Sequence, residues 1–163
     1  MELTREVTAE REYVMAEGLV LTREEAAKQL AGADAQKTLY LVAEVGGRVV
    51  GQAGFFRGEY TKNAHTGQLW IVVAREHRGL GVGRAMMERG IAWARSIGIR
   101  KLKLRVFATN QRAQNLYRSM GFVEEARLRG DVIIDGRVVD DVLMALWMDG
   151  QRGPPPGSKS ANK

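Results

Sequence analysis

Hydrophobic and polar residues alternate along the chain in a pattern that predicts short strands separated by two amphipathic helices. Apolar residues over 39–45 and 48–56 flank Gly46-Gly47, which is the pattern of a β-hairpin with a two-residue turn. A mostly apolar run over 67–73 predicts a central strand. The alternation of basic and apolar residues over 101–107 predicts a strand with one face in contact with water.

Two helices are predicted from apolar residues at helical spacing. The first covers about 83–97 and ends at Gly98. The second follows Asn110, a good N-cap, and ends at Gly121. We assign no chemistry to the three tryptophans, which fit periodic core positions: Trp70, Trp93 and Trp147.

The two ends of the chain complete the expected order of elements. Strands near 126–134 and 138–148 are joined through Asp135-Gly136, a strong hairpin signal. Near the beginning, Thr22-Arg-Glu-Glu25 is a capping box for a short helix that ends near Gly32. The order helix, three strands, helix, strand, helix and two strands indicates an α/β fold with helices packed on a sheet.

Length and composition limit the classes of protein. The 163 residues fit one domain over 1–150 and a flexible tail, rich in proline, glycine, serine and lysine, over 151–163. The absence of cysteine excludes disulfides and thiol chemistry, and only two histidines argue against a metal centre. No apolar run approaches the ~20 residues of a membrane span, so we expect a cytoplasmic protein that does not bind membranes.

The net charge of +6 is concentrated in one segment. Residues 75–105 hold nine bases against two acids, a balance of +7, while the tail adds +3 and the remainder carries −4. A local positive field of this kind suits a compact polyanionic ligand. A solvated basic helix face is an equally good reading of the charge alone.

A glycine-rich turn, Arg78-Gly79-Leu80-Gly81-Val82-Gly83, lies in the basic segment between a predicted strand and a predicted helix. Glycines allow a ligand to approach the backbone, and the free N–H groups of the helix start favour an anion such as a pyrophosphate. A tight strand-to-helix turn without a ligand is the alternative. The turn lacks Gly-Lys-Ser/Thr and the spacing Gly-x-Gly-x-x-Gly, so neither a Walker loop nor a dinucleotide fold is supported.

Two motifs resemble those of the GNAT superfamily of N-acetyltransferases. Arg78-x-x-Gly81-x-Gly83 is similar to its acetyl-coenzyme A (acetyl-CoA) signature, and Val73 matches its strand-end valine. Asn110-x-x-Ala113-x-x-Leu116-Tyr117-x-x-x-Gly121-Phe122 resembles its second motif. The resemblance runs from about Leu39 to Met148, and the end of the chain looks most like bacterial L-amino-acid and small-amine N-acyltransferases.

The resemblance implies a fold and a reaction. The fold is a mixed, mostly antiparallel sheet flanked by helices, with a V-shaped splay between the fourth and fifth strands. The family's first strand has no clear counterpart in 1–18, so we expect it to be missing or irregular. The reaction is transfer of an acetyl group from acetyl-CoA to a primary amine, by direct attack and without metal, on a small molecule such as an amino acid or amine.

The resemblance also implies site residues. Tyr117 would protonate the departing thiolate, and Asn110 would contact the pantetheine arm. The cofactor-binding residues carried over are Val72, Val73, Arg78, Gly79, Leu80, Gly81, Val82, Gly83, Arg84, Asn110, Ala113 and Tyr117. From spacing alone, a core tyrosine is the favoured reading of Tyr117, and only the resemblance reverses it; Asn110 could be a plain helix cap, a role that can coexist with ligand binding.

The general base and the acceptor stay open. An amine of pKa ~10 must lose a proton before it attacks, and Glu59, His65, Glu76 and water are the candidates for its removal. Protein N-terminal acetylases of the superfamily often carry a glutamate where this chain has Arg105, which argues against a ribosomal-protein acetylase. Dimerisation is common in the family, so a homodimer is a further open expectation.

Two other classes compete with the enzyme. A nucleic-acid-binding module would need aromatic residues between the bases, and 101–105 has none, so we expect no nucleic-acid partner. A catalytically silent acyl-CoA sensor would share the cofactor site and differ only in turnover.

Overall fold

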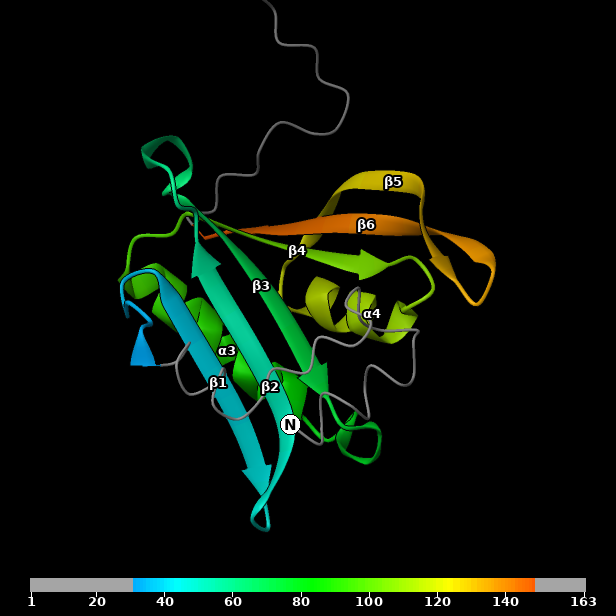
Figure 1. Cartoon of the computed structure of the whole chain (residues 1–163), viewed down its shortest axis with the longest axis horizontal. Helices are drawn as coiled ribbons and strands as arrows, with labels where there is room; N and C mark the ends of the chain where they lie inside the picture. The colour runs from blue at the N-terminus through cyan, green and yellow to red at the C-terminus, as the bar shows by residue number, and fades with distance from the viewer. Residues whose placement is uncertain (1–30, 149–163) are drawn as a thin grey trace, which may run out of the picture.

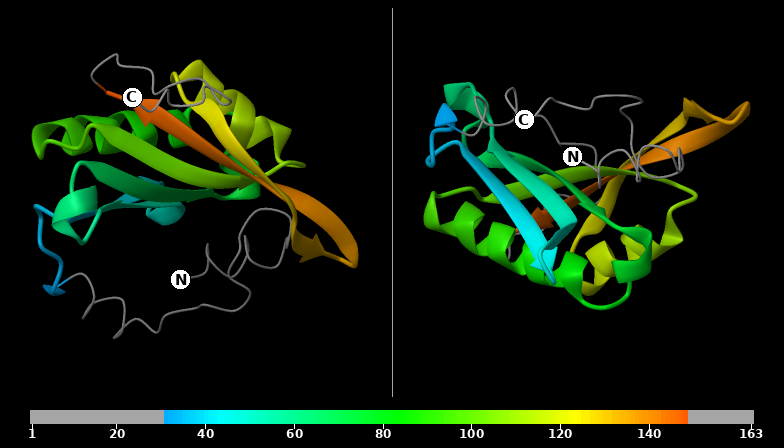
Figure 2. Two further views of the ribbon diagram at one scale, coloured as in Figure 1. Left: turned by 90° about the horizontal axis from the view of Figure 1, so that it is seen from above. Right: turned by 60° about the horizontal axis from the view of Figure 1, so that its bottom comes forward.

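The computed structural model describes residues 31–148. They form a six-stranded sheet in the order β1-β2-β3-β4-β6-β5, with helices α3 and α4 on one of its faces (Figures 1 and 2). The predicted helix that begins at Thr22, the region of the family's first strand and the tail lie outside the described residues. No helix within 31–148 is long and apolar enough to cross a membrane.

The strands and helices follow the predicted order with small shifts at their ends. The strands are β1 (Thr38–Val45), β2 (Arg48–Arg57), β3 (Thr66–Val73), β4 (Lys101–Phe107), β5 (Val123–Ile134) and β6 (Arg137–Trp147). The helices are α3 (Val82–Ser96) and α4 (Gln111–Ser119), with short 3₁₀ turns at Thr61–Asn63 and Arg75–His77. Strand β5 starts at Val123, three residues before the predicted 126, and so includes Glu124 and Glu125. It is an edge strand, which tolerates charged residues and the register shift observed between Glu124 and Ala126.

Both predicted hairpins are confirmed. Gly46 and Gly47 connect β1 to β2 with φ of +58° and +80°, and Asp135 and Gly136 connect β5 to β6 with φ of +47° and +76°. Positive φ at both central residues is the geometry of the turn that matches the twist of the strands. Glycine, asparagine and aspartate tolerate this conformation, which explains why the sequence signal was reliable.

The predicted splay in the sheet lies between β3 and β4. Every other strand pair is antiparallel, whereas β3 and β4 are parallel and pair only from Thr66↔Lys101 to Gln68↔Lys103. Beyond these three pairs the strands diverge, and α4 is visible in the angle between them (Figure 1). The resemblance numbers them fourth and fifth because it counts a strand before Thr38, where residues 1–30 are not described.

The core lies between the sheet and the two helices. Helix α3 buries Met86, Met87, Ile91 and Ala94, and Phe55 of β2 packs on it. Gly90 allows the close approach, since a Cβ there would lie 1.8 Å from Cζ of Phe55. Trp70 is 43% exposed, so the prediction that it is a core residue is wrong. It alternates with Leu69 and Ile71 and therefore lies on the sheet face that does not contact α3 and α4.

Candidate active site

Within 31–148, the part of strand β3 that follows Gln68 has no ladder hydrogen bonds with β4. Ala74 N–H donates to Val50 O at 2.9 Å, so the backbone of Ala74 is directed at β2. Since backbone groups alternate in direction along a strand, those of Val72 also face β2, and those of Ile71 and Val73 face the angle toward β4. The pairing with β4 ends at Gln68, before these residues. Val73 therefore lies where an extended ligand could add its own hydrogen bonds to β3.

Arg78 closes the end of this segment. Its Nε donates a 2.8 Å hydrogen bond to the carbonyl oxygen of Val73. The guanidinium therefore sits between the end of β3 and the glycine-rich turn that follows. This contact links the two parts of the predicted signature, the strand-end valine and the arginine that begins the turn.

The glycine-rich turn leads into α3 with its amides uncovered. Gly79 and Gly81 adopt φ of +81° and +87°, which side chains other than glycine rarely accept. Gly81 is the N-cap and no side chain caps the helix, whose first internal hydrogen bond runs from Ala85 N to Gly81 O at 3.0 Å. Within 31–148 the amides of 82–84 have no hydrogen-bond partner, and the first turn holds no acid. This arrangement is an anion site of the kind that binds phosphate.

Helix α4 contributes basic and apolar contacts to the same turn. A Cβ on Gly79 would lie 2.5 Å from Nη2 of Arg112, and a Cβ on Gly83 would lie 3.3 Å from Cδ2 of Leu116. Arg84 of α3 donates a 2.7 Å hydrogen bond to the hydroxyl of Ser119. Sequence reasoning did not find Arg112, because it lies outside the basic segment and at an unspecified position of the second motif. Only the fold brings it next to Gly79.

Asn110 is the predicted cap of α4. Its Oδ1 accepts a 3.1 Å hydrogen bond from the amide of Ala113, which leaves the side-chain NH₂ group as a donor. The buried side chain of Gln114 then fixes the helix to the end of β4 by donating to the carbonyls of Phe107 and Ala108, at 3.2 and 3.0 Å. The start of α4 is thus held beside the end of the strand that splays away from β3.

Tyr117 is a buried residue of α4 whose side chain belongs to the core. Its side chain is 6% exposed and its ring packs on Phe122, with 5.9 Å between ring centroids. No hydrogen bond to its hydroxyl is formed within the described part of the chain. Burial raises the pKa of Tyr117 above its ordinary value, so the group stays protonated and can donate.

The candidate bases are spread along β3 rather than brought together. Glu59 and His65 are exposed in the segment that precedes β3, at the end where β3 and β4 still pair. Strand β3 is eight residues long, or about 25 Å, so both lie far from the glycine-rich turn. Glu76 is exposed in the 3₁₀ turn between β3 and the glycine-rich turn, so it is the candidate nearest to the predicted cofactor site.

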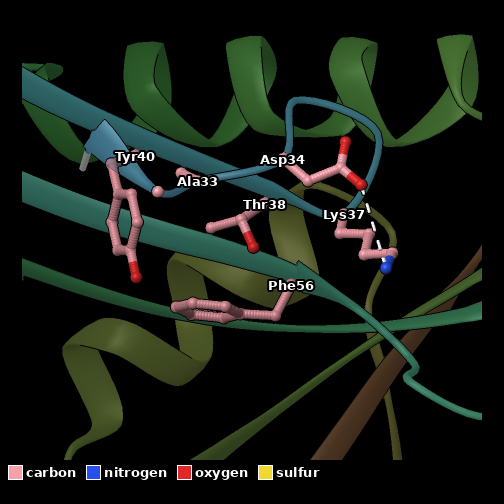
Figure 3. A pocket seen from close by; sticks show the side chains of 7 residues that line it. Ala33, Asp34, Lys37, Thr38, Tyr40 and Phe56 are labelled. Atoms are coloured by element: carbon pink, nitrogen blue, oxygen red, sulfur yellow. Dashed lines mark ion pairs between the residues drawn. The ribbon is translucent and has the colours of Figure 1, made fainter. Parts of the chain in front are cut away.

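A pocket of about 440 Å³ lies away from this site, at the beginning of β1 (Figure 3). Tyr40 and Phe56 meet edge to face in its wall, and Lys37 pairs with Asp34 at 3.8 Å. Thr38 is in register with Phe56, and Phe56 with Gln68, which places the pocket at the paired end of β3. It is therefore separated from the glycine-rich turn by most of the length of that strand.

Comparison with known proteins assigns the family. The sequence model described as "Acetyltransferase (GNAT) family" matches residues 7–122. The chain is 32% identical to L-amino acid N-acyltransferase MnaT of Escherichia coli (strain K12) over 117 residues, which are 70% of this chain and 67% of that protein. It is 37% identical to spermidine N(1)-acetyltransferase of Vibrio cholerae over 71 residues, 43% of this chain, and spans only 41% of the length of that relative.

A solved structure supports the same assignment. The structure of yncA from Salmonella typhimurium with its cofactor acetyl-CoA superposes with a TM-score of 0.78 at 25% identity, covering 94% of this chain and 88% of that one. This similarity of fold leads to the same family as the sequence model, which matches residues 7–122. The splay between β3 and β4 and the glycine-rich turn of this chain are the features that the resemblance predicted. The chain therefore belongs to the acetyltransferase (GNAT) family and is an acyl-CoA-dependent N-acyltransferase.

Proposed function

We propose that the protein transfers an acetyl group from acetyl-CoA to the primary amine of a small molecule. The observation that carries the proposal is the row of amides at 82–84 that have no partner within 31–148, next to the part of β3 that no longer pairs with β4. One part suits a pyrophosphate and the other an extended amide-containing arm, and acetyl-CoA contains both. The solved relative that holds acetyl-CoA supports the same choice of co-substrate.

The residues around the glycine-rich turn suit the phosphates and the pantetheine arm of acetyl-CoA. Gly79, Gly81 and Gly83 keep side chains away from the amides, and Arg112 adds a positive charge over the turn. The helix dipole of α3 favours the phosphate charge in the same place. Asn110 keeps its side-chain donors for the carbonyls of the arm while it caps α4.

Acetyl-CoA supplies a thioester carbonyl that a neutral amine attacks directly, and the sulfur departs as a thiolate. The amine loses its proton first, to Glu76 or to water, since an ammonium has no lone pair for the attack. As the carbon–nitrogen bond forms and the carbon–sulfur bond breaks, the nitrogen loses a further proton to water, and the Tyr117 hydroxyl protonates the departing sulfur and regains a proton from solvent. Its raised pKa keeps it protonated at neutral pH, and it has no competing acceptor among the described residues.

The acceptor is proposed to be a small molecule rather than a protein terminus. Two relatives that match the chain are named for an L-amino acid and for spermidine, and both substrates are small amines. Arg105 stands where N-terminal acetylases of the superfamily often carry glutamate, which argues the same way.

An acceptor screen tests the proposal. The protein is incubated with acetyl-CoA and a panel of amino acids, amines and N-terminal peptides, and release of free thiol is followed. We expect amine-dependent release with small amines above that with peptides. Binding of acetyl-CoA without turnover on any amine would instead support a sensor.

A further inference from the structure

A charged cluster lies beside the splay, on the sheet face away from the helices. Arg105 of β4 donates from Nε to Oδ2 of Asp141 on β6, and from Nη2 to Oδ2 of Asp131 on β5. Its neighbours Leu104 and Val106 belong to the core that contacts α3 and α4. Since side chains alternate along a strand, Arg105 points to the opposite face.

The pairing of β4 with β6, and a shift in the pairing of β6 with β5, bring these three side chains together. Asp141 is in register with Phe107, the last residue of β4, at the end where β3 and β4 have diverged. The pairing of β5 with β6 shifts between Leu128 and Val132, a bulge that redirects Asp131 toward Arg105.

Asp141 differs from its partners in burial and in an unmet hydrogen bond. Its side chain is 1% exposed, against 43% for Arg105 and 39% for Asp131. Oδ2 accepts from Arg105, but Oδ1 is buried and has no hydrogen-bond partner within 31–148. A buried carboxylate oxygen without a donor is costly, and native proteins rarely leave one. The oxygen therefore marks a place where the described residues supply no donor.

The neighbouring cations do not supply that donor. Lys101 pairs with Glu125 at 2.6 Å, and Arg127 pairs with Glu124 at 3.1 Å. Lys103 lies on the same face as Arg105 and makes no ion pair with either aspartate among the described residues. The two carboxylates share one guanidinium, so among the described residues Oδ1 of Asp141 has no cation of its own.

We propose that Oδ1 of Asp141 binds a second ammonium group on the amine acceptor, an inference that rests on the proposed function. The reacting nitrogen must be neutral and lie in the angle between β3 and β4. Asp141 lies one strand farther, beyond β4, so it can reach only a distal group of the acceptor. The cluster is a specificity site that favours a diamine over an acceptor with a carboxylate.

Three acceptors of equal length test this inference. They are 1,4-diaminobutane, pentylamine and 5-aminopentanoate, which carry a distal ammonium, methyl or carboxylate. We expect kcat/KM for the diamine to exceed that for pentylamine by about tenfold or more, as for a hydrogen bond to a charged group. The carboxylate should be the poorest acceptor.

Two variants localise the preference. Asp141→Asn should remove most of the advantage of the diamine and leave pentylamine within about threefold of its original kcat/KM. Asp34→Asn, the matched control, removes a carboxylate that pairs with Lys37 in the distant pocket and should keep the preference. Melting curves report whether each variant folds, and if Asp141→Asn does not fold, the three acceptors on the unchanged protein still decide.

Equal rates for the diamine and pentylamine would overturn the inference, as would a preference that survives in folded Asp141→Asn. Failure to acetylate any of the three while acetyl-CoA raises the melting temperature would also overturn it, and would leave the cofactor part of the proposed function intact. Absence of acetyl-CoA binding would overturn both.

Discussion

At the residue scale, the contacts of a side chain could be predicted where its partners are close in the sequence. Asn110 caps α4 as predicted, because the amide it binds lies only three residues away. Trp70 was assigned to the core and is exposed, since its burial depends on what covers a sheet face. Arg112 was missed because its contact with Gly79 joins positions far apart in the chain.

Tyr117→Phe separates the proposed acid role from packing. The change removes only the hydroxyl, which has no protein partner within 31–148, and keeps the ring on Phe122. We expect kcat to fall by roughly 10²–10⁴-fold, with acetyl-CoA affinity and melting temperature nearly unchanged. Tyr40→Phe, in the wall of the distant pocket, serves as the matched control and should keep full kcat. Full kcat with a lowered melting point would leave Tyr117 as packing alone.

The pH dependence of this residue has a definite sign. Burial raises the pKa of Tyr117 above the ordinary value of about 10, so its hydroxyl stays protonated throughout the range below pH ~10. Above pH ~10 the tyrosine ionises in the unfolded state but not in the folded state, so this residue lowers the stability of the fold only in that range. A fall in kcat between pH 7 and 9 that disappears in Tyr117→Phe would contradict this.

Gly81→Asp tests the anion site at the start of α3. A Cβ at Gly81 meets nothing within 4 Å, so the side chain fits, but its charge would oppose a phosphate at the uncovered amides. Gly81→Asn is the matched control, because both residues tolerate positive φ and only the charge differs. By calorimetric titration we expect the aspartate variant to bind acetyl-CoA about tenfold more weakly than the asparagine variant, or about 1.4 kcal/mol. Equal affinities would remove the amides from the site.

At the element scale, periodicity predicted the strands and helices, and turn chemistry predicted both hairpins. The pattern of residues 67–73 and 101–107 does not show that β3 and β4 pair over only three residues. Divergence of two strands is decided by what packs beneath them, here α4 with its buried Gln114 and Tyr117. The splay could therefore be expected from the family resemblance alone.

Gly90 is a point of very close packing between α3 and the sheet, where a Cβ would lie 1.8 Å from Cζ of Phe55. In Gly90→Ala the added Cβ would overlap the ring of Phe55, which is fully buried. Alanine favours a helix over glycine by up to ~1 kcal/mol, but overpacking a core costs typically about 1–3 kcal/mol, so we expect net destabilisation. Urea unfolding measures it, with Arg89→Ala on the exposed face of α3 as the control. A Gly90→Ala protein as stable as the parent would mean that α3 is not so close to β2.

At the scale of the whole molecule, the two proposed binding regions lie on opposite faces of one splayed sheet. The glycine-rich turn and α4, with Tyr117, are on the helix side, and the cluster of Arg105, Asp131 and Asp141 is on the other. Sequence reasoning reached the first region because its motifs are contiguous. It noted Arg105 but not the aspartates, because three strands must pair before these side chains meet.

The melting temperature with and without acetyl-CoA tests the central claim most directly. At ~100 times the dissociation constant, binding to the folded state adds ~2.7 kcal/mol, which for a domain of this size raises the melting temperature by about 5–10 °C. Acetyl-pantetheine lacks the pyrophosphate and should raise it less at equal concentration, since it leaves the amides of 82–84 uncovered. A melting curve that millimolar acetyl-CoA does not move would contradict the account.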